Sequence, residues 1–118
     1  MTKILIVDDA AFMRMKTKKL LAAMGYDVVE ASNGAEAVDT YKRTKPDCVL
    51  LDITMPDMDG LTALKLLLAL DPNARVTMLT AMGQQTIVLE ALQSGAVDFI
   101  VKPFDSARVL AAVEKMVA

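Results

Sequence analysis

Ile4-Leu-Ile-Val-Asp-Asp9 is the stretch that decides the fold, because four apolar residues in a row run directly into two carboxylates. Three more short apolar runs also end in a polar residue. They are Cys48-Val-Leu-Leu51 before Asp52, Val76-Thr-Met-Leu79 before Thr80, and Phe99-Ile-Val101 before Lys102. Runs that are apolar on both faces are typical of parallel strands covered by helices on each side. The polar ends of such strands lie along one edge of one sheet, where open α/β sheets bind ligands.

Between these runs, the apolar residues recur with the period of a helix. Helical stripes cover about residues 13–24, 34–44, 61–70, 84–93 and 106–117, and Asp27-Val-Val-Glu-Ala31 is a more polar strand. Five strand–helix units predict a doubly wound α/β fold of the flavodoxin-like kind, a three-layer sandwich around a parallel sheet. Right-handed crossovers favour the strand order 2-1-3-4-5, with the polar strand at an edge and the ligand crevice between strands 1 and 3.

Length and composition limit the class of protein. The 118 residues predict a single domain, 1–118, without an effector domain. Thirteen basic and 15 acidic residues are mixed along the chain, so we expect no nucleic-acid binding. The longest apolar runs reach five residues, which argues against membrane insertion, and the first residues do not look like a signal peptide. The one cysteine, Cys48, is expected to be a buried small hydrophobe, and we predict a cytoplasmic monomer.

The polar strand ends predict a site for a divalent cation and a phosphoryl group. Three clustered carboxylates, Asp8, Asp9 and Asp52, raise one another's pKa unless a cation neutralises them. Mg²⁺ suits such a site, since it binds through one or two carboxylates and completes its shell with water and phosphate oxygens. Asp52 ends the central strand and is the candidate nucleophile for an aspartyl phosphate. The Lys102 ammonium and the Thr80 hydroxyl can each bind one phosphoryl oxygen.

The same residues do not complete a fast hydrolase. The chain contains no histidine. Phosphatases of the haloacid dehalogenase type use a second Asp, two residues after the nucleophile, as a general acid, and here that position is Thr54. The acyl phosphate is therefore expected to persist, which suits a signal and not a turnover enzyme.

Several segments, in order along the whole chain, resemble the receiver domain of two-component response regulators. They are Ile4–Asp9, Asn33-Gly34, Asp52-Ile-Thr-Met-Pro56 with Asp59-Gly60, Thr80-Ala81, and Gly95-Ala-Val-Asp-Phe-Ile-Val-Lys-Pro-Phe104. Each segment alone is a weak signal, but the full set at these spacings is specific. Three segments are also similar to chemotaxis members of the family from Gram-positive and thermophilic bacteria. They are Asp9–Met15, Asp52–Pro56 and Ala81–Gln85.

The resemblance implies a role for each residue of the metal site. Asp52 is the phosphoacceptor, and Asp9 and Asp52 ligate Mg²⁺ directly. The backbone carbonyl of Thr54 is a third ligand, and Asp8 holds metal-bound water. Thr54 and Met82 lie at variable positions of the family that tune the lifetime of the phosphoryl group.

The resemblance also implies a conformational switch. Thr80 and Lys102 contact the phosphoryl oxygens, and the ring of Phe99 turns inward when Thr80 moves toward the phosphate. Lys102-Pro103 matches a peptide bond that is usually cis in the family.

The implied partners are a sensor histidine kinase as donor and, for output, a flagellar switch protein and a phosphatase. Output is expected at the surface of the fourth helix, the fifth strand and the fifth helix, with Val88 and Leu110 as exposed contacts. Met55 is expected to face solvent near the site, and Leu66 to be exposed on its helix. Two alternatives stay open: a phosphorelay shuttle that passes its phosphoryl group to a histidine phosphotransfer protein, and, from another class, a Mg²⁺-dependent phosphatase.

Overall fold

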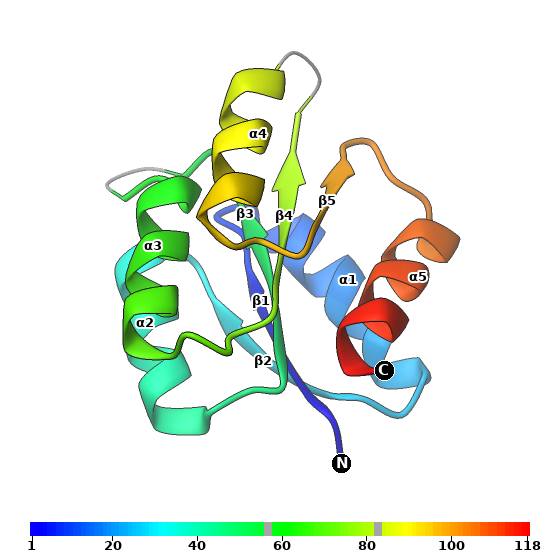
Figure 1. Cartoon of the computed structure of the whole chain (residues 1–118). Helices are drawn as coiled ribbons and strands as arrows, with labels where there is room; N and C mark the ends of the chain where they lie inside the picture. Colours follow the sequence, from blue (N-terminus) through cyan, green and yellow to red (C-terminus); the bar gives the residue numbers. More distant parts are fainter. Residues whose placement is uncertain (56–57, 82–83) are drawn as a thin grey trace.

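In a computed structural model, which describes residues 1–55, 58–81 and 84–118, the chain forms a three-layer α/β sandwich (Figure 1). The middle layer is a five-stranded parallel sheet of order β2-β1-β3-β4-β5. The strands are β1 (Lys3–Val7), β2 (Asp27–Ala31), β3 (Cys48–Asp52), β4 (Val76–Thr80) and β5 (Asp98–Val101). The helices are α1 (Ala11–Ala23), α2 (Gly34–Thr44), α3 (Gly60–Leu70), α4 (Gln85–Ser94) and α5 (Ser106–Val117). The predicted fold class and strand order are confirmed.

Each face of the sheet has its own core. Side chains alternate along a strand, so Ile4 and Ile6 of β1 pack with α1 and α5, whereas Leu5 and Val7 pack with α2, α3 and α4. Figure 1 shows these two layers of helices on opposite sides of the sheet. Both faces of β1, β3 and β4 are buried, which explains why these strands are apolar without alternation. The partly exposed edge strand β2 is the polar one, as predicted.

The register of the strands brings their carboxyl ends to one level. Val7 pairs with Leu51, Asp52 pairs with Leu79, and Thr80 pairs with Val101. Neighbouring strands from β1 to β5 therefore end close together, and the residues that terminate or follow them share one edge.

The start of α3 is built around the backbone of Asp52. The helix is capped by Asp59, whose carboxylate accepts a hydrogen bond from the Thr62 backbone N–H at 2.8 Å. Gly60, the first helical residue, donates its N–H to the Ile53 carbonyl at 2.7 Å. A Cβ at Gly60 would lie 2.2 Å from the Asp52 backbone oxygen, so a residue without a side chain is required here. Asp52 itself is left free of a capping role.

Three predictions of exposure have different outcomes. Leu66 is exposed, as predicted. Val88 was predicted to be exposed, but it is only 8% exposed, because it shares the buried face of α4 with Ala91 while Leu89 turns to solvent. Met55 was predicted to face solvent, but it packs into the core from its position in the β3–α3 loop.

Leu110, a fourth residue that was predicted to be exposed, is only partly exposed, because it packs against the α1–α5 core. None of the described helices has the length and apolar character needed to cross a membrane.

Candidate functional site

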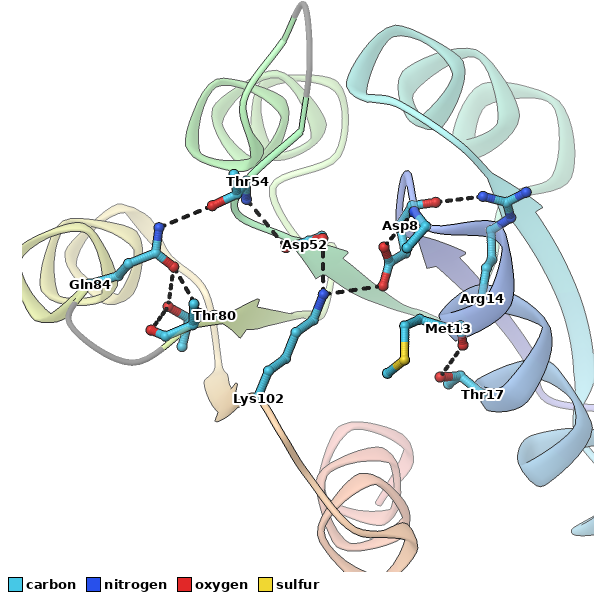
Figure 2. Close-up of polar contacts among 11 residues, drawn as sticks. Asp8, Met13, Arg14, Thr17, Asp52, Thr54, Thr80, Gln84 and Lys102 are labelled. Atoms are coloured by element: carbon cyan, nitrogen blue, oxygen red, sulfur yellow. Dashed lines mark hydrogen bonds and ion pairs between the residues drawn. The ribbon is translucent and has the colours of Figure 1, made fainter.

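The structure brings Asp8, Asp52 and Lys102 together at the carboxyl edge of the sheet, as Figure 2 shows. Asp52 ends β3, Asp8 follows β1, and Lys102 follows β5. The Lys102 Nζ lies 3.1 Å from Asp52 Oδ2 and 3.3 Å from Asp8 Oδ2. One ammonium therefore bridges two carboxylates that come from distant parts of the chain.

Both bridged carboxylates are withdrawn from water. Asp8 is 3% exposed and Asp52 is 5% exposed, whereas Lys102 is partly exposed. Burying a charge is unfavourable unless it is paired and hydrogen-bonded. Asp8 Oδ1 also accepts the Ala10 backbone N–H at 2.9 Å, and Asp52 Oδ1 accepts that of Thr54 at 3.2 Å. These contacts hold the two carboxylates in fixed positions.

Asp9 completes an acidic cluster beside this ion pair. One carboxylate oxygen from each of Asp8, Asp9 and Asp52 lies within 4.8 Å of the others, and Asp9 is exposed to solvent. The cluster offers hard oxygen donors, which fit Mg²⁺ or a similar cation better than the softer metals that prefer thiolate or imidazole. The Thr54 peptide lies beside the cluster, since its N–H contacts Asp52.

The electrostatics of the site favour the binding of a cation. Burial raises the pKa of the Asp52 carboxyl above its usual range, and the charge of Asp8 adds to this, although Lys102 and the Thr54 N–H oppose it. Burial alone would lower the pKa of Lys102, but the contacts with Asp52 and Asp8 raise it above its ordinary value. The ammonium therefore stays charged at neutral pH, while the ionised Asp52 is incompletely compensated.

Thr80 occupies the end of β4, between β3 and β5, and its side chain already has a partner. Its hydroxyl lies 2.9 Å from Oε1 of Gln84, a residue of the segment Ala81–Gln85 for which the sequence predicted no role. Gln84 Oε1 also accepts the Ala81 backbone N–H at 2.8 Å, and its Nε2 donates to Thr54 Oγ1 at 3.0 Å. No sequence pattern predicts that the amide of a glutamine will connect two loops, so this contact is seen only in the structure.

Arg14 is a second residue whose role was not predicted from the sequence. Its Nη1 donates to the backbone oxygen of Asp8 at 2.6 Å, and its Nε lies 3.4 Å from Glu30 Oε1 in β2 (Figure 2 shows the first contact). Arg14 thereby ties α1 and the edge strand to the loop that presents Asp8. Its position in the first turns of α1 gives no hint of partners in two other elements.

Phe99 lies next to the strand that ends in Thr80. It pairs with Met78 of β4 and is partly buried. Its ring lines a cavity of about 430 Å³ between α4 and β5, together with Thr80 and Gln84. The position is compatible with the switch role that the resemblance implies, and that role stays a prediction.

Two further predictions concern residues near the site. The Lys102-Pro103 bond is cis, as the resemblance implied. Met82, expected to tune the lifetime of the phosphoryl group, and Pro56 of the quoted motif lie outside the described residues.

Comparison with protein families gives a match over most of the chain. The response regulator receiver domain family matches residues 4–114. The chain is 59% identical over 114 residues to the chemotaxis protein CheY of Bacillus subtilis, covering 96% of this chain and 95% of the relative. It is 54% identical over 115 residues to CheY of Thermotoga maritima, covering 97% of this chain and 96% of the relative.

Solved structures give the same result. The chain is similar to a structure described as the CheX-CheY-BeF3-Mg+2 complex from Borrelia burgdorferi, with 41% identity and a TM-score of 0.93. That match covers 99% of this chain and 90% of the solved chain.

Proposed function

The chain belongs to the response regulator receiver domain family, and from that premise we propose that its phosphoacceptor is Asp52 and that phosphorylation there switches its affinity for a protein target. One observation carries the assignment. The Lys102 ammonium reaches Asp52 and Asp8 at once, at 3.1 and 3.3 Å, while Asp9 stands within 4.8 Å of both carboxylates. This edge therefore combines an acidic cluster, a nucleophile and a cation for phosphoryl oxygens.

The proposed reaction transfers a phosphoryl group from a phosphohistidine of a sensor histidine kinase. A carboxylate oxygen of Asp52 forms the new O–P bond while the P–N bond of the donor breaks, and its electron pair stays on the imidazole nitrogen. Lys102 stabilises charge on one phosphoryl oxygen, and the Thr80 hydroxyl donates to another. The rigid end of β3 keeps Asp52 in place for in-line attack.

We propose Mg²⁺ as the cofactor, with Asp8, Asp9, Asp52 and the Thr54 backbone carbonyl as the residues that hold it directly or through water. The oxygen-only donor set supports this choice. When bound, the ion supplies the positive charge that the carboxylates and the phosphoryl oxygens require.

The site is better suited to holding a phosphoryl group than to releasing it. The position two residues after Asp52 is Thr54, which cannot act as a general acid, and the chain has no histidine to replace it. We therefore propose a switch and not a turnover enzyme. Steady release of phosphate from small phosphate esters would favour the phosphatase alternative instead.

We propose that the output is protein–protein binding in the cytoplasm by a monomer of one domain. The target surface is formed by α4, β5 and α5, where Leu89 and Leu92 are exposed. The names of the relatives support a role in chemotaxis, and we propose a flagellar switch protein as the target. The solved CheX-CheY complex supports a second protein partner, and we propose that this partner is a phosphatase. Transfer of the phosphoryl group to a histidine phosphotransfer protein would favour the shuttle alternative.

The assignment is tested with a small phosphoryl donor. Incubation with acetyl phosphate and Mg²⁺ is expected to add the mass of one phosphoryl group to the wild-type chain and none to Asp52→Asn. Asp39→Asn is the matched control, since Asp39 is an exposed carboxylate on α2, and it should label like the wild type. Labelling that persists in Asp52→Asn, with the protein folded, would overturn the assignment of Asp52.

A further inference from the structure

The side chain of Gln84 connects the two loops that flank the proposed phosphoacceptor. At one end it accepts hydrogen bonds from Thr80 Oγ1 at 2.9 Å and from the Ala81 N–H at 2.8 Å. At the other end it donates to Thr54 Oγ1 at 3.0 Å, and the Thr54 N–H contacts Asp52. Figure 2 shows the amide between Thr80 and Thr54, on the same side of the sheet edge as Asp52. One side chain thus links the end of β4 to the loop after β3.

The orientation of this amide is determined by its partners. The Ala81 backbone N–H is a donor, so the Gln84 atom 2.8 Å away must be the acceptor oxygen and not the amide nitrogen. The same oxygen faces the Thr80 hydroxyl, and it has no proton to give. The hydroxyl proton of Thr80 must therefore point to Gln84 Oε1 or to the Ala81 carbonyl, 3.1 Å away. In either case this proton already has an acceptor within the protein.

We propose that Gln84 is a positioning residue that competes with the phosphoryl group for the Thr80 hydroxyl, and so opposes activation of the proposed switch. This inference rests on the proposed function. A threonine hydroxyl has one proton, and Thr80 can donate it to a phosphoryl oxygen only after leaving Gln84. Thr80 is 2% exposed, so bulk solvent has little access to it. The contact with Gln84 therefore stabilises the unphosphorylated arrangement against the phosphorylated one.

The location of Gln84 connects this competition to the target surface. Its backbone carbonyl accepts the Val88 N–H at 3.0 Å at the start of α4. Its side chain also lines the cavity between α4 and β5 that Phe99 borders. Loss of the Thr80 contact therefore removes one of the hydrogen bonds that hold a side chain at the junction between the acidic site and the α4–β5 surface.

The test measures the affinity for beryllofluoride, a phosphoryl mimic, by titration at saturating Mg²⁺. Gln84→Met keeps the length of the side chain and removes the amide. We expect it to bind beryllofluoride about three- to tenfold more tightly than the wild type, the range that corresponds to one hydrogen bond between uncharged groups. The matched control is Gln85→Met, at an exposed position one residue further along α4, which should bind like the wild type. Gln84→Ala removes the same amide and should shift the affinity in the same direction.

A double-mutant cycle shows whether the effect passes through Thr80. In a Thr80→Val background, Gln84→Met should leave the affinity for beryllofluoride unchanged, because the contested proton is gone. Unchanged or weaker binding by Gln84→Met, or an equal gain in the Thr80→Val background, would overturn the inference. A wild-type chain that binds no beryllofluoride would contradict the proposed function itself. A wild type that binds, with Gln84→Met equal to it, would reject only the role of Gln84.

Discussion

The amino and carboxyl ends of the same parallel sheet differ in how their polar groups are paired. At the amino end, Asp47 exchanges hydrogen bonds with Lys3: its carboxylate accepts the Lys3 N–H at 2.7 Å, and its own N–H donates to the Lys3 carbonyl at 2.8 Å. Tyr41 likewise donates to Asp71 at 2.8 Å. At the carboxyl end, three carboxylates lie near one another, and one lysine, Lys102, bridges two of them. At one end the polar groups are satisfied in separate pairs, and at the other the charged groups of several strands gather in one cluster.

Along a strand, the apolar residues contribute to stability, whereas the polar residue at the carboxyl end contributes to the site. The middle of β3 is apolar and fully buried, and its last residue is a buried carboxylate whose pKa is raised. A carboxylate in that position is harder to ionise than in water, and the folded state bears that cost at neutral pH. The acidic end therefore stabilises the fold less than the rest of the sheet, and it gains stability when a cation binds. The following predictions test this contrast, from the largest expected effect to the smallest.

Leu50→Ala should cause the largest loss of stability. Leu50 is fully buried in β3, on the same face as Asp52 and two residues before it. Removing a buried leucine side chain is expected to lower the free energy of unfolding by about 2–5 kcal/mol. Urea denaturation followed by circular dichroism measures it.

The matched control is Leu66→Ala, at an exposed leucine of α3, which should change the free energy of unfolding by less than about 0.5 kcal/mol. Equal losses in the two variants would show that the core does not supply the stability assigned to it.

Gly60→Ala should lower both the free energy of unfolding and the affinity of the site for beryllofluoride. The new Cβ would lie 2.2 Å from the Asp52 oxygen and 2.6 Å from the Ile53 Cα, so the backbone under the phosphoacceptor must shift. We expect a loss of about 1–3 kcal/mol in the free energy of unfolding, with weaker binding of beryllofluoride at saturating Mg²⁺. Urea denaturation and titration measure the two effects.

Gly34→Ala provides a comparison at the first residue of another helix, α2. There the three atoms nearest to the new Cβ all belong to the side chain of Met58, and none belongs to the backbone under Asp52. This variant should keep the affinity of the wild type for beryllofluoride. If Gly60→Ala also keeps it, the close approach of α3 to Asp52 does not position the site.

The sequence predicted the fold well because the apolar runs, their polar ends and the helical stripes all agree on it. The same patterns place Asp8, Asp52 and Lys102 at one edge, since the ends of parallel strands must meet there. The burial of Met55 was not predictable, because it depends on how the β3–α3 loop folds back through the hydrogen bond from Gly60 to Ile53. The contacts of Arg14 and Gln84 were missed for a related reason. A long polar side chain finds its partners through loop geometry, which periodicity does not encode.

Mg²⁺ should stabilise the chain by an amount set by its affinity. A ligand that binds only the folded state at ten times its dissociation constant adds about 1.4 kcal/mol to the free energy of unfolding. Asp9→Asn removes one carboxylate of the cluster and should reduce the stabilisation at the same Mg²⁺ concentration. Urea denaturation across a Mg²⁺ titration measures it, with Asp39→Asn as a control that should respond like the wild type. A response of Asp9→Asn identical to that of the wild type would remove Asp9 from the proposed metal site.

The smallest expected effect is a pH-dependent gain in stability in Asp52→Asn without Mg²⁺. The pKa of Asp52 is raised in the folded state by burial and by Asp8. Between the ordinary pKa of an aspartate and this raised value, the folded state therefore binds more protons than the unfolded one. Stability due to this group therefore falls as the pH rises from the ordinary pKa of an aspartate through the raised value. Asparagine has no proton to lose, so the advantage of Asp52→Asn over the wild type should be small in acid. It should grow as the pH rises and become constant once the folded Asp52 is ionised.

Urea denaturation of both proteins at several pH values, at constant ionic strength, measures that advantage. An advantage that does not change with pH would mean that the Lys102 ammonium fully compensates Asp52. The acidic end would then carry no electrostatic cost, and a bound cation would have no such cost to relieve at Asp52.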